Sequence, residues 1–283
     1  MLRGEYSNVD DGHGSSVAGS RGWNKRGWLV CLLIVVLVGF GGLFFSGVLK
    51  PRQVVVEDLD VPVYVGKLDS KIMEWGYGKL HVMLSKSNKT KTQVIALHGS
   101  DKETQNAGHW SPNMGMLSKI GNFCLVDAPG FGESENNRLL QSIPASVSGD
   151  AIQFLLDDMK LLDNEDTKIV FVARGWGVEA LMIFLRNYPE HLNKQNFNYI
   201  FLSPTPLLMK WRRNLTKYFS KANGLIVWAE RDPEIPNSYR KYLKNSMPLM
   251  DEKVIAGIET HYPETSFPGI VSKIVLDWWE KNE

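Results

Sequence analysis

The sequence has little cysteine, little excess charge and no internal repeat. Two cysteines occur in 283 residues, outside any Cys-x-x-Cys pattern, so we expect no disulfide framework, no metal site and no cofactor. Thirty-two basic residues balance 31 acidic ones, and a net charge of +1 lacks the basic excess of a nucleic-acid-binding protein. Without a repeat, a solenoid is excluded. These exclusions leave an ordinary globular protein, whose core is large enough to be stable without disulfides or a bound metal.

One stretch has no charged residue at all. Residues 27–49 form an apolar run of 23 residues, which as a helix would span about 34 Å and cross a bilayer. Basic residues flank it, namely Arg21, Lys25, Arg26, Lys50 and Arg52. We predict a transmembrane helix over 27–49 after a disordered tail, 1–26, and a folded domain over 50–283. The alternative is a cleaved signal peptide, whose apolar region would be shorter, about 7–15 residues.

The flanking charges also predict an orientation. Three basic residues precede the apolar run and two follow it, which favours a cytosolic N-terminus and a large domain in a lumen or outside the cell. Two glycosylation sequons, at Asn88 and Asn214, are compatible with that side. We therefore predict a single-pass protein of type II topology, with the membrane as its partner through residues 27–49.

The folded domain is predicted to alternate strands and helices. Short β-rich runs occur at 53–57, 62–66, 79–85, 92–98, 122–127, 168–173, 198–203, 224–229 and 252–259. Amphipathic helical stretches cover 144–162, 178–188 and 265–280. This order indicates an α/β domain with a mostly parallel sheet covered by helices, in which ligands bind where the strands end.

Several of these strands end in short segments rich in glycine, proline or polar residues. They are His98-Gly99-Ser100, Asp127–Ser134, Ala173–Gly177, Ala229–Pro233 and Glu259–Pro263. In this order and spacing, from about residue 54 onward, the chain resembles the α/β-hydrolase fold. The resemblance implies an eight-stranded, mostly parallel sheet with a nucleophile, an acid and a histidine after successive strands. Only 17 residues, 207–223, separate two of the later strands, which predicts an open cleft without a large cap domain.

The sequence departs from this family at the nucleophile. In the family's G-x-S-x-G turn, the last glycine matches Gly177, but Ala173 replaces the first and Gly175 stands in the serine's place. Glycine has no side chain that could attack a carbonyl. Residues 168–190 contain no Ser, Cys or Thr, so no shift of register supplies a nucleophile.

The other parts of the family's catalytic site have matching residues. The resemblance places the acid at Asp232, the base at His261 and the oxyanion-hole N–H groups at Ser100 and Trp176. Asp232 and His261, taken singly, also fit structural roles in turns. The neighbouring Arg174 is expected to face solvent or to pair with Glu179.

Three functions remain open. The first is a pseudoenzyme that binds a small molecule or protein in its cleft. In this respect the chain resembles the N-myc downstream-regulated family, which has a hydrolase fold with a non-nucleophilic turn. The second is a hydrolase- or lyase-type enzyme that uses the pair Asp232 and His261 on small esters or related carbonyl substrates. The third is an ordinary hydrolase with a displaced nucleophile such as Ser203, which we expect instead to terminate a strand. Cys124 is predicted to be a buried packing residue.

Overall fold

The computed structural model describes residues 57–85, 90–101, 104–134, 145–192, 194–205, 219 and 221–283. The predicted tail, the predicted transmembrane helix and the asparagines of both sequons lie outside these ranges, as does most of the connection 207–223. Within the described ranges, no helix is both long and apolar enough to cross a membrane.

The described part of the domain contains an eight-stranded sheet, as predicted, in the order β1-β2-β4-β3-β5-β6-β7-β8. Its strands are β1 (Leu68–Trp75), β2 (Gly78–Ser85), β3 (Thr92–Leu97), β4 (Asn122–Val126), β5 (Lys168–Arg174), β6 (Phe197–Leu202), β7 (Asn223–Ala229) and β8 (Met250–Ile255). Strand β2 is antiparallel to both β1 and β4, and the other neighbours are parallel. The sheet is therefore mostly parallel.

The first strand differs from the prediction. Residues 62–66 form no strand, and the part of 53–57 before residue 57 lies outside the description. The first strand is instead β1, most of whose side chains are exposed, so its sequence lacks the apolar pattern that marks a buried strand. In the segment 62–66, Tyr64 packs edge-on against Phe123 with the ring centroids 5.0 Å apart. Its apolar residues reflect packing rather than strand pairing.

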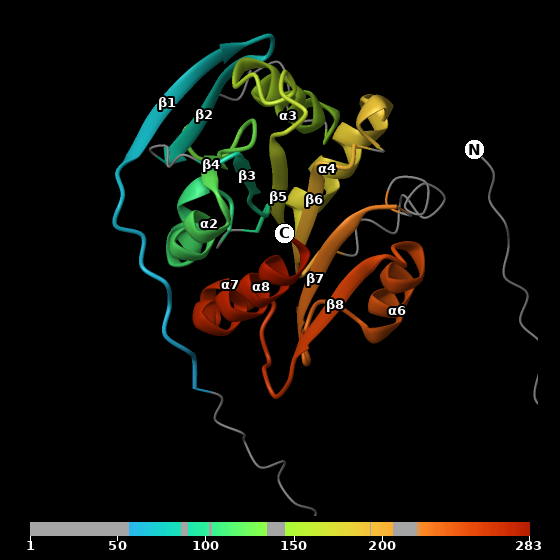
Figure 1. Ribbon diagram of the computed structural model, residues 1–283. Coiled ribbons are helices and arrows are strands. Elements are labelled where there is room, and N and C mark those ends of the chain that lie inside the picture. Colours follow the sequence, from blue (N-terminus) through green and yellow to red (C-terminus); the bar gives the residue numbers. More distant parts are fainter. Residues whose placement is uncertain are drawn as a thin grey trace, which may run out of the picture. The chain divides into compact units, whose positions relative to one another are not determined.

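Helices cover both faces of the sheet (Figure 1). They are η1 (Ala107–Asn113), α2 (Met114–Ile120), α3 (Ala145–Asp158), α4 (Trp176–Asn187), η2 (Pro189–His191), α6 (Asn237–Ser246), α7 (Pro263–Ser266) and α8 (Pro268–Asn282). Helices α3, α4 and α6 pack on one face, and η1, α2 and α8 on the other. Strand alternation produces this division, because Phe171 of β5 belongs to the first layer and its neighbours Val170 and Val172 to the second.

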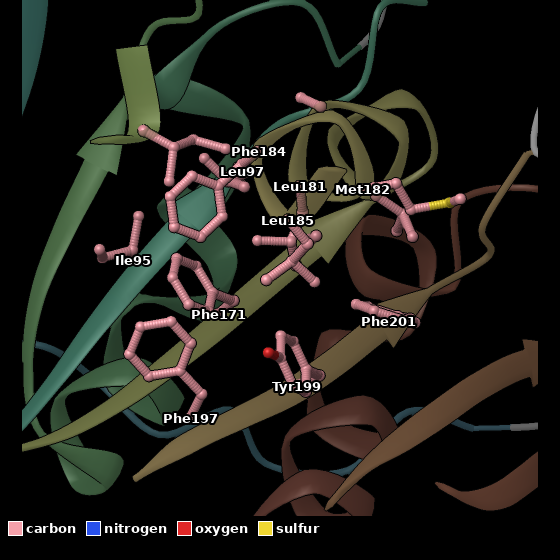
Figure 2. Close-up of a cluster of buried hydrophobic side chains, with 14 of the residues drawn as sticks. Ile95, Leu97, Phe171, Leu181, Met182, Phe184, Leu185, Phe197, Tyr199 and Phe201 are labelled. Carbon is pink, nitrogen blue, oxygen red and sulfur yellow. The ribbon is translucent and has the colours of Figure 1, made fainter. Parts of the chain in front are cut away.

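Aromatic rings fill much of the first layer (Figure 2). Phe171 of β5 stacks on Tyr199 of β6 at 5.9 Å and meets Phe197 edge-on at 5.3 Å. Phe184 of α4 lies 6.1 Å from Phe171, which joins this helix to the centre of the sheet. Large buried rings each remove much apolar surface from water, so this packing fixes the position of α4, at whose start the candidate site lies.

Candidate functional site

The turn between β5 and α4 is centred on Gly175. This residue has φ +51° and ψ −115°, a backbone conformation in the region that favours glycine. Its N–H donates to the carbonyl of Leu202, which ties the turn to the end of β6. A Cβ built on Gly175 would lie 3.4 Å from Thr205 Cγ2 and 4.0 Å from Gly99 Cα. The turn therefore has room for a side chain, and the loop after β3 lies beside it.

The start of α4 packs tightly against the end of β3. A Cβ on Gly177 would lie 2.6 Å from the Leu97 carbonyl oxygen and 2.8 Å from that of His98. Only glycine allows this approach of backbone to backbone. It brings the loop containing Ser100 to the first turn of α4, where the N–H of Trp176 has no partner further up the helix. The two N–H groups that the resemblance assigns to the oxyanion hole thus come from adjoining segments.

Asp232 and His261 are hydrogen-bonded to each other. His261 Nδ1 lies 3.0 Å and 2.9 Å from the two carboxylate oxygens of Asp232. The backbone N–H groups of Glu234 and Ile235 also donate to Asp232, at 2.9 Å and 3.1 Å, so the carboxylate is held by its own turn. With Asp232 accepting, Nδ1 carries the proton and Nε2 has a free lone pair.

The second ring nitrogen of His261 is buried without a hydrogen bond from the described residues. Within the described ranges, Nε2 makes no hydrogen bond, although Glu234 Oε2 lies 3.4 Å away. A polar atom left unpaired in a protein interior is costly and is uncommon outside functional sites. The orphaned Nε2 is therefore a candidate for binding or for proton transfer.

A buried arginine joins the turn to the histidine loop. Arg174, the last residue of β5, donates from Nη2 to the backbone carbonyl of His261 at 3.2 Å, and its guanidinium stacks 4.4 Å from the Tyr262 ring. It also pairs with Asp101 after β3, and its Nε lies 3.3 Å from Glu264 Oε1. The expectation that Arg174 faces solvent is wrong, because the side chain has no exposed surface.

This group of charges was missed by the sequence analysis. Glu264, also without exposed surface, lies between Arg174 and His109, whose Nε2 is 3.0 Å from Glu264 Oε1. Buried charges are stable only when paired, so these contacts fix the end of β5, η1 and α7 relative to one another. An arginine at the end of an otherwise apolar strand was the one signal in the sequence, since the buried centre of a parallel sheet demands a partner for it.

A histidine and an apolar cavity lie next to the predicted oxyanion loop. His98 is buried, and desolvation lowers its pKa from 6.5 to about 4, so the ring is neutral. The neutral ring accepts from the N–H of Ala128 at 2.9 Å through Nε2. Beside it, Leu97, Val126, Ile152, Leu155 and Trp176 line a narrow apolar cavity of about 20 Å³. A cavity of this volume has room for a group about the size of a water molecule or a methyl group.

Two other residues keep the positions predicted for them. Ser203 directly follows β6 with φ +41°, its N–H donates to the Val227 carbonyl, and its hydroxyl has no exposed surface. This is the position of a residue that ends a strand, as predicted. Cys124 is buried in β4, and burial raises the pKa of its thiol to about 12, which makes it unreactive.

Comparison with known proteins shows the fold alone. No family model matches the chain, and no curated protein matches it. A predicted CIB-like hydrolase from Thermoplasma acidophilum is similar in structure, with 16% identity and a TM-score of 0.62 over 75% of this chain and 98% of that one. The naproxen esterase (carboxylesterase NP) of Bacillus subtilis matches with 17% identity and a TM-score of 0.56 over 76% and 93%.

A third solved structure is an alpha-beta serine hydrolase homologue from Coxiella burnetii, with 14% identity and a TM-score of 0.58 over 76% of this chain and 99% of that one. The described domain thus has the α/β-hydrolase fold, as the resemblance implied. The solved structures that it resembles include carboxylesterases. A fold does not by itself determine a reaction, which depends on the residues of the site.

Proposed function

We propose that this chain is an α/β-hydrolase-fold protein that binds a small carbonyl-bearing molecule, or a partner that presents one, beside the turn of Gly175, without forming an acyl-enzyme in that cleft. Gly175 carries the proposal. It occupies the strand-to-helix turn where the fold presents its nucleophile, with a backbone φ of +51°, and it has no atom that could attack a carbonyl. The N–H groups of Ser100 and Trp176 would bind the carbonyl oxygen, and the apolar cavity would take its short substituent.

A fluorophosphonate probe tests this proposal. We expect no adduct on Ser100 or Ser203 of the wild-type full-length protein, as read by mass spectrometry of its peptides. Gly175→Ser should acquire an adduct on its introduced hydroxyl, because the turn has room for a Cβ and His261 retains an acceptor nitrogen. Gly175→Ala is the matched control, with the same backbone strain and no hydroxyl. A wild-type adduct on Ser100 or Ser203 would show a displaced nucleophile and overturn the proposal.

A second candidate function rests on the unpaired Nε2 of His261. Held by Asp232, this nitrogen could take a proton from water, and the hydroxide would attack a bound small ester directly. No covalent intermediate on the protein is then required. If the full-length protein hydrolyses an aryl ester by this route, His261→Gln should lower the rate by about 10²-fold. Undiminished turnover in that variant rules this route out.

We further propose that residues 27–49 anchor the domain, 50–283, to a membrane with the domain on the lumenal or outer side. The 23-residue apolar run and its flanking basic residues support this placement. In expressing cells, the full chain should resist alkaline carbonate extraction, and deletion of 27–49 should release it. Endoglycosidase treatment should shift the wild type but not an Asn88→Gln/Asn214→Gln double variant. An unshifted wild type would contradict the orientation.

A further inference from the structure

A second aspartate–histidine pair occurs on other strands of the sheet, and there a serine completes it. His81 of β2 has Nδ1 2.8 Å from Asp127 Oδ2, just after β4. Its Nε2 lies 2.9 Å from the Oγ of Ser70 on β1. Serine, histidine and aspartate are thus linked through the two different ring nitrogens, which is the connectivity of a charge-paired nucleophile.

The partners of Asp127 determine where the protons lie. The backbone N–H groups of Ala107 and Glu133 donate to its two oxygens, at 2.5 Å and 2.8 Å. These N–H groups can only donate, so the carboxylate accepts from both and from His81 Nδ1 as well. With its proton on Nδ1, His81 has a lone pair on Nε2, and the hydroxyl of Ser70 donates to it. This is the tautomer that a general base requires.

The pair is held rigidly, whereas the serine is accessible. His81 and Asp127 are each less than 5% exposed, and the N–H of Asp127 donates to the His81 carbonyl. Ser134 Oγ accepts from the N–H of His81 at 2.8 Å and donates to the Asp127 carbonyl at 2.7 Å. Ser70 is exposed on β1, the strand at one end of the sheet. A reagent from solution can therefore reach a hydroxyl whose base is already oriented.

We propose that Ser70 is a nucleophilic serine, activated by His81 and Asp127, that accepts acyl groups from small activated esters. Ser70 Oγ forms a bond to the ester carbonyl carbon while its proton moves to His81 Nε2. The carbon–oxygen bond to the leaving group then breaks, and the alcohol departs with that proton. In the second step, water forms a bond to the acyl carbon while its proton moves to His81 Nε2. The bond from that carbon to Ser70 Oγ then breaks, Oγ takes the proton back from Nε2, and the acid is released.

The surroundings of Ser70 determine the class of substrate. The carboxylate of Glu133 lies 3.8 Å from His81 Nε2, but its side chain is 73% exposed, so water screens its charge. As a terminal strand, β1 presents backbone N–H groups at its outer edge, but these face water, where they stabilise an oxyanion less than enclosed donors do. We therefore expect aryl esters and similar activated acyl donors to react, and amides not to react.

Labelling of the full-length wild-type protein with a fluorophosphonate tests the proposal within one molecule. Ser111 is the internal control, an exposed serine whose hydroxyl donates to a backbone carbonyl, that of Gly108, rather than to a histidine. By peptide mass spectrometry, we expect Ser70 to be labelled about 10²-fold faster than Ser111. Equal rates at the two serines would overturn the proposal and would leave the three residues a purely structural role.

Variants test the proposal in a second way, and the melting temperature of each shows whether it folds. Ser70→Ala, on the exposed side of β1, should keep the melting temperature and lose both the adduct and aryl-acetate hydrolysis at this site, whereas Ser111→Ala should change neither. His81→Asn, if it melts as the wild type does, should slow labelling of Ser70 by at least about tenfold. An adduct on Ser70 leaves the proposal for Gly175 intact, because that proposal is tested on the peptides that contain Ser100, Gly175 and Ser203. If Ser70 is labelled, the assay of His261→Gln is performed in the Ser70→Ala background.

Discussion

Two sites in this chain are built on the same pair of residues and differ in the third. In the site at the β5–α4 turn, here called the elbow site, Asp232 holds His261, whose carbonyl accepts from Arg174, the residue before Gly175. In the site on β1 and β2, here called the strand site, Asp127 holds His81 beside Ser70. Both aspartates accept two backbone N–H groups as well as a histidine. The difference is that His81 Nε2 has a hydroxyl partner and His261 Nε2 has none within the described ranges. A histidine oriented by an aspartate is thus not by itself evidence of a nucleophile. Whether a nucleophile is present depends on one neighbouring residue.

The two sites also differ in what holds them. Buried charges surround the elbow site, where Arg174 joins Asp101, Glu264 and the loop of His261. At the strand site, neutral hydrogen bonds of Ser134 bridge the backbones of β2 and the segment after β4 around the buried carboxylate of Asp127. Buried charges cost much more than neutral groups when a partner is removed. Substitutions around the elbow site should therefore have the larger effects on stability.

The largest expected effect is that of Arg174→Met. Removal of the guanidinium leaves Glu264 buried without its cation, so the free energy of unfolding should fall by about 3–5 kcal/mol in urea denaturation. The double variant Arg174→Met/Glu264→Gln should recover part of this loss, and Arg231→Met, at an exposed arginine, should change little. A loss below about 1 kcal/mol would remove the contrast between the two sites.

Acid should weaken the fold through His98, beside the elbow site. Burial lowers its pKa to about 4 in the folded state, against 6.5 when unfolded. Above pH 6.5 the ring is neutral in both states and contributes nothing, whereas between pH 6.5 and 4 only the unfolded chain takes up the proton. The free energy of unfolding should therefore fall by about 3 kcal/mol over that range. Urea titrations at pH 7.5 and 4.5 give the loss of unfolding free energy for the wild type and for His98→Asn. The difference between the two losses measures the contribution of His98.

The two glycines of the turn should respond differently to alanine. A Cβ on Gly177 meets the Leu97 carbonyl at 2.6 Å, so Gly177→Ala must move backbone, at a cost of about 2–3 kcal/mol. Gly175→Ala makes only an ordinary van der Waals contact with Thr205 and should cost about 1–2 kcal/mol, for a positive φ. Thermal unfolding of the two variants measures the difference. Equal losses would mean that the turn has no room for a nucleophile, which would weaken the reading of Gly175 as a replaced serine.

The smallest effect is expected at the strand site. Ser134→Ala removes the hydroxyl that links the N–H of His81 to the Asp127 carbonyl, and should cost about 1–2 kcal/mol in urea denaturation. Ser118→Ala, whose hydroxyl donates to the Gly115 carbonyl within one helix, is the matched control and should cost less. A loss as large as that of Arg174→Met would show that the strand site is held as strongly as the elbow site.

The sequence predicted most of the sheet, and its one clear failure has a physical cause. The strands from β2 onward lie within a few residues of the predicted runs, because buried strands of a parallel sheet are continuously apolar. Strand β1 was missed because it is a terminal strand with mostly exposed side chains, and only its pairing with β2 makes it a strand. The apolar segment 62–66 was wrongly taken as a strand, since apolar composition does not distinguish packing from pairing.

The candidate sites show the same division. By itself the sequence determined the alternation of strands and helices, the glycine in the turn after β5, and the order of Asp232 and His261, since each depends on residue types near one another in the chain. Only the tertiary structure decided that Arg174 is buried against Asp101 and Glu264, and that Ser70, His81 and Asp127 meet. These contacts join residues 11 to 90 positions apart, and the register of strand pairing and the packing of helices, which are properties of the whole domain, bring them together.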